Sequence, residues 1–300
     1  MSRKLVLVTG CSDGGLGSAL AIAFQKAGCR VFATARNPAK MSEMKASGIE
    51  ILVLDVTSLD SIKSCADEVR KLADGTLDVL VNNAGRGYSM PICDVKLEEM
   101  RRLFETNLYP IVTVTQGFLP LLLKAKGGGL IVNNTSVCSV LGVPMEGIYN
   151  ASKGAVALLS ETMRIEMATF NIKVVDMKTG AVESRIDENQ ILGPDSLVPE
   201  SSLFSAGRDA LNAAFSGDAL KDGDERMPRH QWAKTVVSRL LKRNPPLHLW
   251  AGTYSALIWI VTRLLPVGAF NSYLRRKYEF PKLVGDAPKT VRQGCLGEGL

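Results

Sequence analysis

Tyr149 and Lys153 stand four residues apart, a spacing that places two side chains on one face of a helix. A phenol has a pKa near ~10, which is too high for ready proton exchange at neutral pH, and a nearby ammonium favours its phenolate form. The pair could therefore exchange protons with a reacting oxygen. A tyrosine and a lysine at this spacing are common, however, and usually mark only the surface of a helix.

A cluster of glycines begins at Gly10, where the sequence TGCSDGGLG covers residues 9–17 directly after an apolar segment. Glycines let the backbone turn sharply and approach a pyrophosphate, whose charge is favoured by free N–H groups and by the dipole of a following helix. An ordinary tight turn also uses glycine. The position after a first strand and before a helix favours a dinucleotide-binding turn.

Arg36 and Asp55 follow the next two apolar segments. An enzyme that prefers NAD usually has an acidic residue at the end of the second strand, whereas Arg36 could pair with the 2′-phosphate of NADP. Arg36 could also be a solvated surface residue. Asp55 fits a contact with the adenine edge of the cofactor, or a cap for a helix that starts near Ser58.

The elements that would position these residues alternate between short apolar segments and longer amphipathic ones. Strands are predicted over residues 4–9, 30–35, 49–55, 77–82, 130–134, 172–177 and 247–250, and helices over 17–27, 58–72, 97–123, 151–169, 202–214 and 231–243. Such alternation gives right-handed crossovers between parallel strands. We therefore expect an α/β fold of the Rossmann type, a doubly wound parallel sheet of about seven strands with helices on both faces.

The chain has 300 residues, and the pattern predicts one domain over residues 1–252, followed by a C-terminal helical extension over 253–300. A substrate lid is expected at about residues 184–229, where prolines and glycines interrupt the pattern. From Arg226 onward the chain carries 13 Lys and Arg against 3 Asp and Glu, a net charge of 13 − 3 = +10. No nucleic-acid-binding motif accompanies this charge, so no nucleic-acid partner is expected.

The extension begins with an apolar segment over residues 253–265, flanked on both sides by basic residues. It is shorter than the roughly 20 residues that span a bilayer. Such a segment suits a helix lying in a membrane interface near anionic headgroups. The alternatives are a helix packed on a partner subunit of a homo-oligomer, or one that lies across the mouth of the substrate pocket.

Six cysteines are scattered along the chain without a CxxC pair, and there are only two histidines. This usage excludes a disulfide scaffold and predicts no metal site. The first apolar segment is too short for the core of a signal peptide. We therefore expect a cytoplasmic protein whose cysteines are small core residues.

Taken in order along the chain, these motifs resemble the short-chain dehydrogenase/reductase family over residues 4–252. The matching pieces are the TG…GLG turn, the sequence NNAG at 82–85, Asn107, Ser136, and the pair Tyr149 and Lys153. Ser136 stands thirteen residues before Tyr149, which is the spacing seen in that family.

The resemblance implies catalytic roles for these residues. Tyr149 would donate and accept the proton, and Ser136 would bind the substrate carbonyl. Lys153 would bind the nicotinamide ribose and lower the pKa of Tyr149. Asn107 would support a water-mediated proton relay to Lys153. In this scheme the cofactor supplies the hydride, while the protein supplies orientation and proton transfer.

The resemblance also implies an NADP(H) site. The expected cofactor-binding residues are Thr9, Gly10, Ser12, Gly15, Leu16, Gly17, Arg36, Asp55, Asn83, Tyr149, Lys153, Val182 and Ser184. The chain departs from the family pattern in two places. The glycine turn is one residue longer, which leaves open whether Gly14 or Gly15 approaches the pyrophosphate. Thr179 and Gly180 stand where the family usually has Pro-Gly.

Within the family, the segments TGCSDGGLGSALA, ATARNP and LDVTS most resemble the fungal NADPH-dependent 1-acyl-dihydroxyacetone-phosphate reductases and related ketoreductases of secondary metabolism. The former reduce a lipid ketone at the endoplasmic reticulum or at lipid droplets, so peripheral attachment there is a further expectation.

Met90, Val143 and Met145 predict an apolar substrate pocket. Such a pocket favours a hydrophobic ketone or secondary alcohol, such as a polyketide, a terpenoid or a sterol-like compound, over a sugar. One alternative is the acyl-phosphate substrate, for which Arg185 and Arg208 are available. An alternative of another class is a non-catalytic NADP-binding or membrane-surface scaffold.

Overall fold

In the computed structural model, seven strands form one sheet in the order β3-β2-β1-β4-β5-β6-β7, and each neighbouring pair is parallel. The structure describes residues 3–186, 197–215, 226–266 and 268–278. The strands are β1 (Leu5–Thr9), β2 (Arg30–Ala35), β3 (Glu50–Val53), β4 (Val79–Asn82), β5 (Gly129–Asn134), β6 (Ile172–Thr179) and β7 (His248–Ala251). The expected Rossmann-type doubly wound sheet is confirmed.

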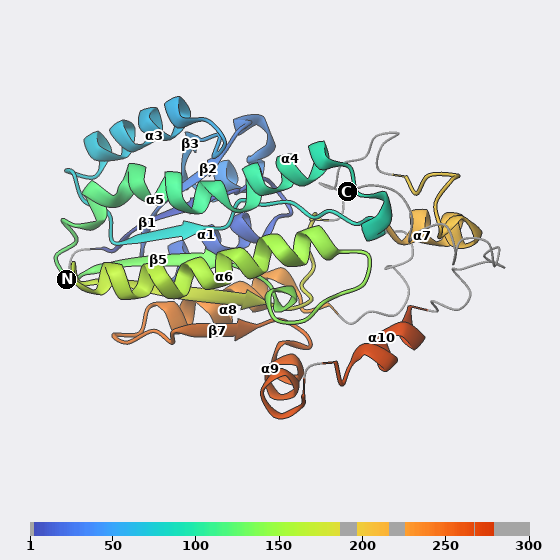
Figure 1. The fold of residues 1–300 in the computed structure, drawn as a ribbon. Helices are drawn as coiled ribbons and strands as arrows, with labels where there is room; N and C mark the ends of the chain where they lie inside the picture. The colour runs from blue at the N-terminus through green and yellow to red at the C-terminus, as the bar shows by residue number, and fades with distance from the viewer. Residues whose placement is uncertain (1–2, 187–196, 216–225, 267, 279–300) are drawn as a thin grey trace.

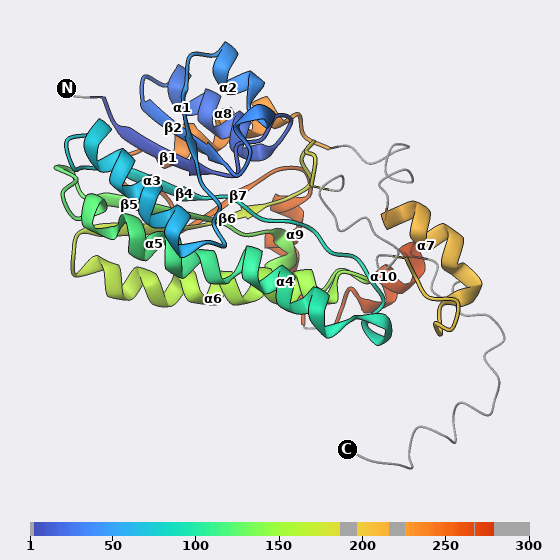
Figure 2. The same ribbon diagram turned by 90° about the horizontal axis from the view of Figure 1, so that it is seen from above.

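Helices cover both faces of this sheet (Figures 1 and 2). One face carries α1 (Leu16–Lys26), α2 (Ser42–Ala46) and α8 (Arg229–Leu240). The other carries α3 (Leu59–Leu72), α4 (Leu97–Asn107), α5 (Tyr109–Leu122) and α6 (Gly147–Ala168). Outside these two layers lie α7 (Arg208–Phe215), α9 (Ser255–Leu264) and α10 (Asn271–Lys277). Because the sheet is buried on both faces, its strands are continuously apolar rather than alternating.

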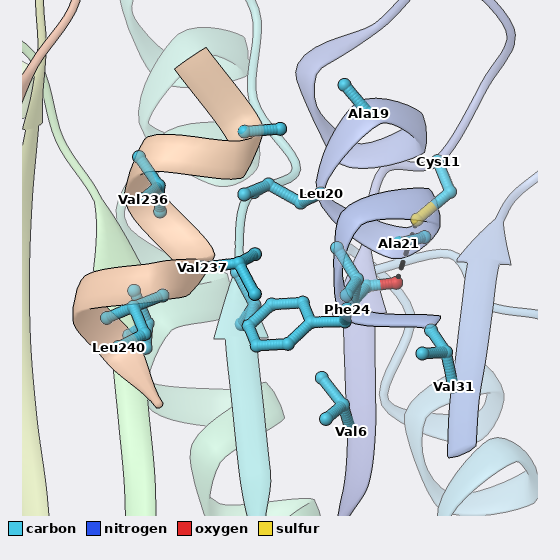
Figure 3. Close-up of a cluster of buried hydrophobic side chains, with 14 of the residues drawn as sticks. Val6, Cys11, Ala19, Leu20, Ala21, Phe24, Val31, Val236, Val237 and Leu240 are labelled. Atoms are coloured by element: carbon cyan, nitrogen blue, oxygen red, sulfur yellow. Dashed lines mark hydrogen bonds between the residues drawn. The ribbon is translucent and has the colours of Figure 1, made fainter. Parts of the chain in front are cut away.

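Fully buried side chains join α1 and α8 to the sheet (Figure 3). The ring of Phe24 in α1 lies close to Val6 of β1 and Val237 of α8. Cys11 belongs to the same cluster, and its thiol donates to the carbonyl oxygen of Val8 at 3.2 Å. Burial raises the pKa of this thiol to about 12, so Cys11 is a packing residue and not a nucleophile.

The expectation that the cysteines are core residues is only partly correct. Cys11, Cys29 and Cys65 are buried, but Cys138 is half-buried and Cys93 is exposed. Cys93 lies in a short 3-10 helix (Ile92–Asp94) that follows the end of β4 and is not covered by the helical layers. Cys295 lies outside the described residues.

The single helix predicted over residues 97–123 is in fact two helices, α4 and α5. They meet at Leu108, where the backbone (φ −109°, ψ −57°) departs from regular helical geometry, and Pro110 stands in the first turn of α5. Proline has no N–H to continue the hydrogen bonding of the preceding helix. The break places Asn107 at the end of α4, next to the loop that follows β4.

The C-terminal extension contains α9 and α10. Residues Leu257, Trp259, Ile260 and Leu264 of α9 are exposed. Among the described residues, no helix combines the length and the apolar character that a bilayer span requires.

Candidate active site

A cleft of about 510 Å³ opens at the carboxyl ends of the strands. The chain order of the sheet reverses between β1 and β4, and in open α/β sheets ligands bind at such a switch point. Of the residues expected to form the site, this cleft is lined by Gly10, Ser12, Gly15, Leu16, Arg36, Asp55, Asn83, Ser136, Tyr149, Lys153, Val182 and Ser184. The fold thus gathers residues from across the first 184 positions into one cleft.

Gly14 and Gly15 have different places in the glycine turn. Gly15 lines the cleft and immediately precedes α1. Gly14 is absent from the lining and has a left-handed backbone (φ 75°), and a Cβ on it would lie 2.5 Å from Cδ of Arg185. Gly15 is therefore the better placed of the two to approach a pyrophosphate.

The longer turn is accommodated by α2, a short helix that the sequence analysis missed. The carboxylate of Asp13 accepts from the backbone N–H groups of Ser42 and Glu43 at the start of α2, both at 2.8 Å. Glu43 in turn accepts from the N–H of Gly14 at 3.3 Å and pairs with Arg229 of α8 at 2.8 Å. The hydrogen bond from Arg229 lowers the pKa of Glu43. An aspartate in the turn was the available sequence signal, because carboxylates favour helix N-termini.

Thr9 and Gly17 lie behind the wall of the cleft instead of lining it. The hydroxyl oxygen of Thr9 accepts from the backbone N–H groups of Asn83 and Ala84, both at 2.9 Å, and so ties β1 to the NNAG segment. A Cβ on Gly17 would lie 2.3 Å from the carbonyl oxygen of Gly10. This glycine therefore lets α1 approach the turn closely. Both residues shape the site without lining it.

Asn107 also lies behind the wall and is 1% exposed. Its Oδ1 accepts from the N–H of Arg86 at 2.9 Å, while its Nδ2 donates to the carbonyl of Arg86 at 3.0 Å and to Oγ of Ser152 at 3.2 Å. Gly85 lies between Asn107 and the catalytic candidate Lys153: a Cβ on it would meet Oδ1 at 3.2 Å and Nζ at 3.6 Å. Asn107 thus holds the loop after β4, and its part in a proton relay stays a prediction.

Arg36 and Asp55 line the cleft where β2 and β3 end. Arg36 is exposed and lines the cleft. The carboxylate of Asp55 accepts from the backbone N–H of Thr57 at 3.0 Å and from its hydroxyl at 2.7 Å. The N-cap of α3 is Ser58, whose hydroxyl accepts from the N–H of Ser61. The helix-cap alternative for Asp55 is therefore wrong, and Asp55 lines the cleft.

Tyr149 and Lys153 lie in the first two turns of α6, and both are buried. Nζ of Lys153 lies 5.8 Å from the centroid of the Tyr149 ring and donates to the carbonyl oxygen of Asn134 at 2.9 Å. Burial lowers the pKa of Lys153 to about 8, while Cys138 and Asp176 act in the opposite direction. An ammonium so close to a phenol favours the phenolate form of the tyrosine.

Ser136 directly follows the end of β5 and lines the same cleft as Tyr149 and Lys153. It caps the short 3-10 helix η3 (Val137–Ser139), and its Oγ accepts from the N–H of Cys138 at 3.1 Å. The serine, the phenol and the ammonium therefore border one space, an arrangement suited to proton transfer at a carbonyl oxygen.

The substrate end of the cleft differs from the expected apolar pocket. Met90 and Met145 belong to a buried cluster behind the cleft, and neither they nor Val143 line it. The sequence analysis missed residues that do line this end: Arg86, Tyr88, Ser89, Cys138, Glu146 and Ile186. Their position in the segments that follow β4, β5 and β6 was the only signal, because active sites of such folds are built from loops at the carboxyl ends of strands.

Arg185 and Arg226, which lie in the segment expected to form a lid, also line the cleft. Arg208 does not: its Nε donates to the carbonyl oxygen of Val198 at 2.7 Å. Residues 187–196 and 216–225 of the expected lid lie outside the described residues.

Comparison with known proteins agrees with the family that the motifs resemble. The family model described as short chain dehydrogenase matches residues 4–193. A short-chain dehydrogenase/reductase of Pestalotiopsis microspora is 41% identical over 92% of this chain and 94% of its own. The NADPH-dependent 1-acyldihydroxyacetone phosphate reductase of Schizosaccharomyces pombe is 33% identical over 93% and 96%.

Among solved structures, a short-chain dehydrogenase from Streptomyces avermitilis is similar, with a TM-score of 0.70 and 27% identity, covering 94% of this chain and 98% of that one. Together with the matches above, this confirms the family expected from the motifs. The chain belongs to the short-chain dehydrogenase family and is an oxidoreductase of that family.

Proposed function

We propose that this protein transfers hydride between NADP(H) and a hydrophobic ketone or its secondary alcohol. The observation that carries the proposal is that Ser136, Tyr149 and Lys153 line the same cleft as the glycine turn and Arg36. The cleft fits a dinucleotide, because Gly10 and Gly15 of the turn line it directly before the N-terminus of α1, where free backbone N–H groups favour a pyrophosphate. When bound, the nicotinamide supplies or accepts the hydride.

In the reductive direction, the hydroxyl of Tyr149 gives its proton to the substrate oxygen as the carbonyl carbon gains a hydride. The hydroxyl of Ser136 holds that oxygen by a hydrogen bond. Lys153 stays protonated and stabilises the phenolate that remains on Tyr149. In the oxidative direction the same phenolate takes the proton back.

The preference for NADP(H) over NAD(H) rests on charge at the adenosine end. Arg36 lines the cleft there, and the last residue of β2 before it is Ala35, which offers no carboxylate to a ribose hydroxyl. The named cofactor of the Schizosaccharomyces pombe relative agrees with this preference.

For the substrate, we favour a bulky hydrophobic ketone of secondary metabolism. The lining residues Tyr88 and Ile186 belong to, or pack against, the buried apolar cluster next to the cleft. A second candidate is a 1-acyl-dihydroxyacetone phosphate. It is favoured by Arg185 and Arg226 in the lining, which could receive a phosphate, and by the activity named for the Schizosaccharomyces pombe relative.

We expect Tyr149→Phe to lower turnover of a model ketone such as phenanthrenequinone by at least about 100-fold, because the variant has no phenolic proton to transfer. Binding of NADPH, followed by its fluorescence, should stay within a fewfold of wild type. Tyr109→Phe, on the exposed outer face of α5, is the matched control. A Tyr149→Phe variant with wild-type turnover would contradict the catalytic proposal, and cofactor binding without turnover in the wild type would favour the scaffold alternative.

Arg36→Asp should change the ratio of kcat/KM for NADPH to that for NADH by about tenfold or more in favour of NADH. The substitution removes a charge-assisted hydrogen bond and places a like charge beside the 2′-phosphate. Lys45→Asp, an equal change of charge at an exposed position of α2, is the control. An unchanged ratio in Arg36→Asp would mean that the arginine is only a surface residue.

Burial of the Lys153 charge should lower the free energy of unfolding of the cofactor-free protein. Its pKa is about 8 in the folded chain against 10.5 for an ordinary lysine. The folded state therefore binds fewer protons between these pH values, and stability rises with pH there. Lys153→Met should be more stable than wild type at pH 7 by roughly 1–3 kcal/mol, with the difference shrinking towards pH ~10. Urea unfolding measures both values.

The exposed Lys63→Met serves as the control in that experiment. If Lys153→Met raises the free energy of unfolding by the same amount at pH 7 and at pH 10, removal of the buried charge is not the cause of the increase.

We further propose a cytoplasmic protein that contacts a membrane surface, such as the endoplasmic reticulum or a lipid droplet, through α9. The exposed apolar face of α9 is followed by Arg275, Arg276 and Lys277 in α10, a combination that suits anionic headgroups. The homo-oligomer stays a prediction, supported by the exposed Leu158 and Ile165 on α6.

Replacing both Leu257 and Ile260 by Glu should release the full chain from vesicles that contain phosphatidylserine, as measured by flotation, because it places charges on the face that would enter the interface. Leu59→Glu on α3 is the control, since this leucine is also exposed but far from α9 in sequence. If the wild-type chain does not float with the vesicles, the membrane proposal fails. Comparing the oligomeric state of the wild type with that of the double variant then tests whether α9 packs on a partner subunit.

A further inference from the structure

Beneath the cleft, polar side chains form a row that crosses four strands in register. The row runs from Asn82 of β4 to Asn133 of β5, Asp176 of β6 and His248 of β7. Asn82 donates to Asn133 at 2.9 Å, and His248 lies 3.3 Å from Asp176. Charged groups in the interior of a sheet are costly unless they are paired. The row therefore needs an explanation other than packing.

Asp176 is fully buried, and several polar groups contact its carboxylate. The hydroxyl of Thr135 donates to one of its oxygens. The ammonium of Lys178, two residues further along the same face of β6, pairs with the other at 2.7 Å. Lys178 is also buried, and its Nζ donates to Oγ of Ser139 at 3.0 Å. The pair thus contacts two residues of one short segment.

That segment, residues 135–139, carries Ser136. Thr135 precedes this serine and Ser139 ends η3, so Asp176 and Lys178 hold the segment on both sides of it. β5 ends at Asn134, and beyond it the N–H of Thr135 still donates to the carbonyl of Met177 at 2.9 Å. Beyond Thr135, the segment is joined to β6 by the hydrogen bond between the side chains of Ser139 and Lys178.

We infer that Asp176 and Lys178 are positioning residues, which hold residues 135–139 between them so that the hydroxyl of Ser136 is presented to the cleft. This inference rests on the role proposed above for Ser136. A shift of about 1 Å in a group that orients a substrate can cost about 100-fold in rate. An ion pair that adds little stability can thus matter for turnover.

Asp176 has a second effect on the site. Its negative charge opposes the lowering of the Lys153 pKa by burial, so the carboxylate helps to keep that ammonium protonated. A substitution of Lys178 removes the contact with Ser139 but keeps Asp176, and so keeps the charge that acts on Lys153. The two members of the pair can therefore be tested separately.

The test uses the full chain with NADPH and phenanthrenequinone. We expect kcat to fall about 10- to 100-fold in Lys178→Met, with KM for NADPH unchanged within about twofold, and Lys178→Arg to recover most of kcat because it keeps the charge and the donors. Ser139→Ala, which breaks only the far contact of Lys178, should lower kcat by a smaller factor. Glu161→Gln is the matched control: it pairs with His248 at the outer end of the network and touches no residue of the segment.

The double variant with Asp176→Asn and Lys178→Met separates positioning from stability. It leaves no unpaired charge buried, so its melting temperature should recover relative to either single variant, whereas kcat should not. Hydrogen exchange of the peptide over residues 130–140 should accelerate in Lys178→Met and in the double variant, but not in Glu161→Gln. Wild-type kcat in the double variant, or unchanged exchange in the segment, would overturn the inference.

The exchange measurement does not depend on turnover. If the wild-type chain reduced no ketone, the proposed function would fail, while protection of the segment by Lys178 would still be decided by exchange.

Discussion

Burial of the Lys153 ammonium constrains much of the cleft around it. The charge needs a hydrogen-bond acceptor inside the protein, and it finds the carbonyl oxygen of Asn134 at the end of β5. The side chain of Asn134 also donates to Asn83 at 2.9 Å and accepts from the hydroxyl of Thr179 at 2.6 Å. One asparagine therefore joins the ends of β4, β5 and β6 and holds the ammonium among them. Any movement of these strand ends would change the environment of the lysine.

This arrangement explains the Thr-Gly that stands where the family usually has Pro-Gly. The hydroxyl of Thr179 makes a hydrogen bond that a proline could not make. Gly180 keeps its family identity for a steric reason: a Cβ on it would lie 2.3 Å from the carbonyl oxygen of Thr253. The start of the C-terminal extension is thereby packed directly against the cleft wall. The longer glycine turn is compensated in a similar way, by Asp13 and α2.

The two sides of the cleft are built differently. The cofactor side consists of strand ends and backbone held by hydrogen bonds between buried polar groups, such as those of Thr9 and Asn107. The proposed substrate side consists of loop residues and an adjacent apolar cluster. Loops of this kind vary independently of the sheet that carries them. For this reason proteins that share this fold can differ in substrate.

The amino-acid sequence by itself determined the fold class and the family, and most of the site residues that it predicted line the cleft. These follow from local patterns: apolar segments separated by turns, glycines before a helix, and Tyr149 and Lys153 one turn apart. A single sequence carries no comparable signal for contacts between distant segments. Only the tertiary structure decided that Asp13 accepts hydrogen bonds from the start of α2, and that Thr9 and Asn107 lie behind the wall of the cleft. The same holds for the contacts of Asp176 and Lys178 with the segment that carries Ser136. Each of these depends on side chains brought together by the stacking of strands, which no local spacing encodes.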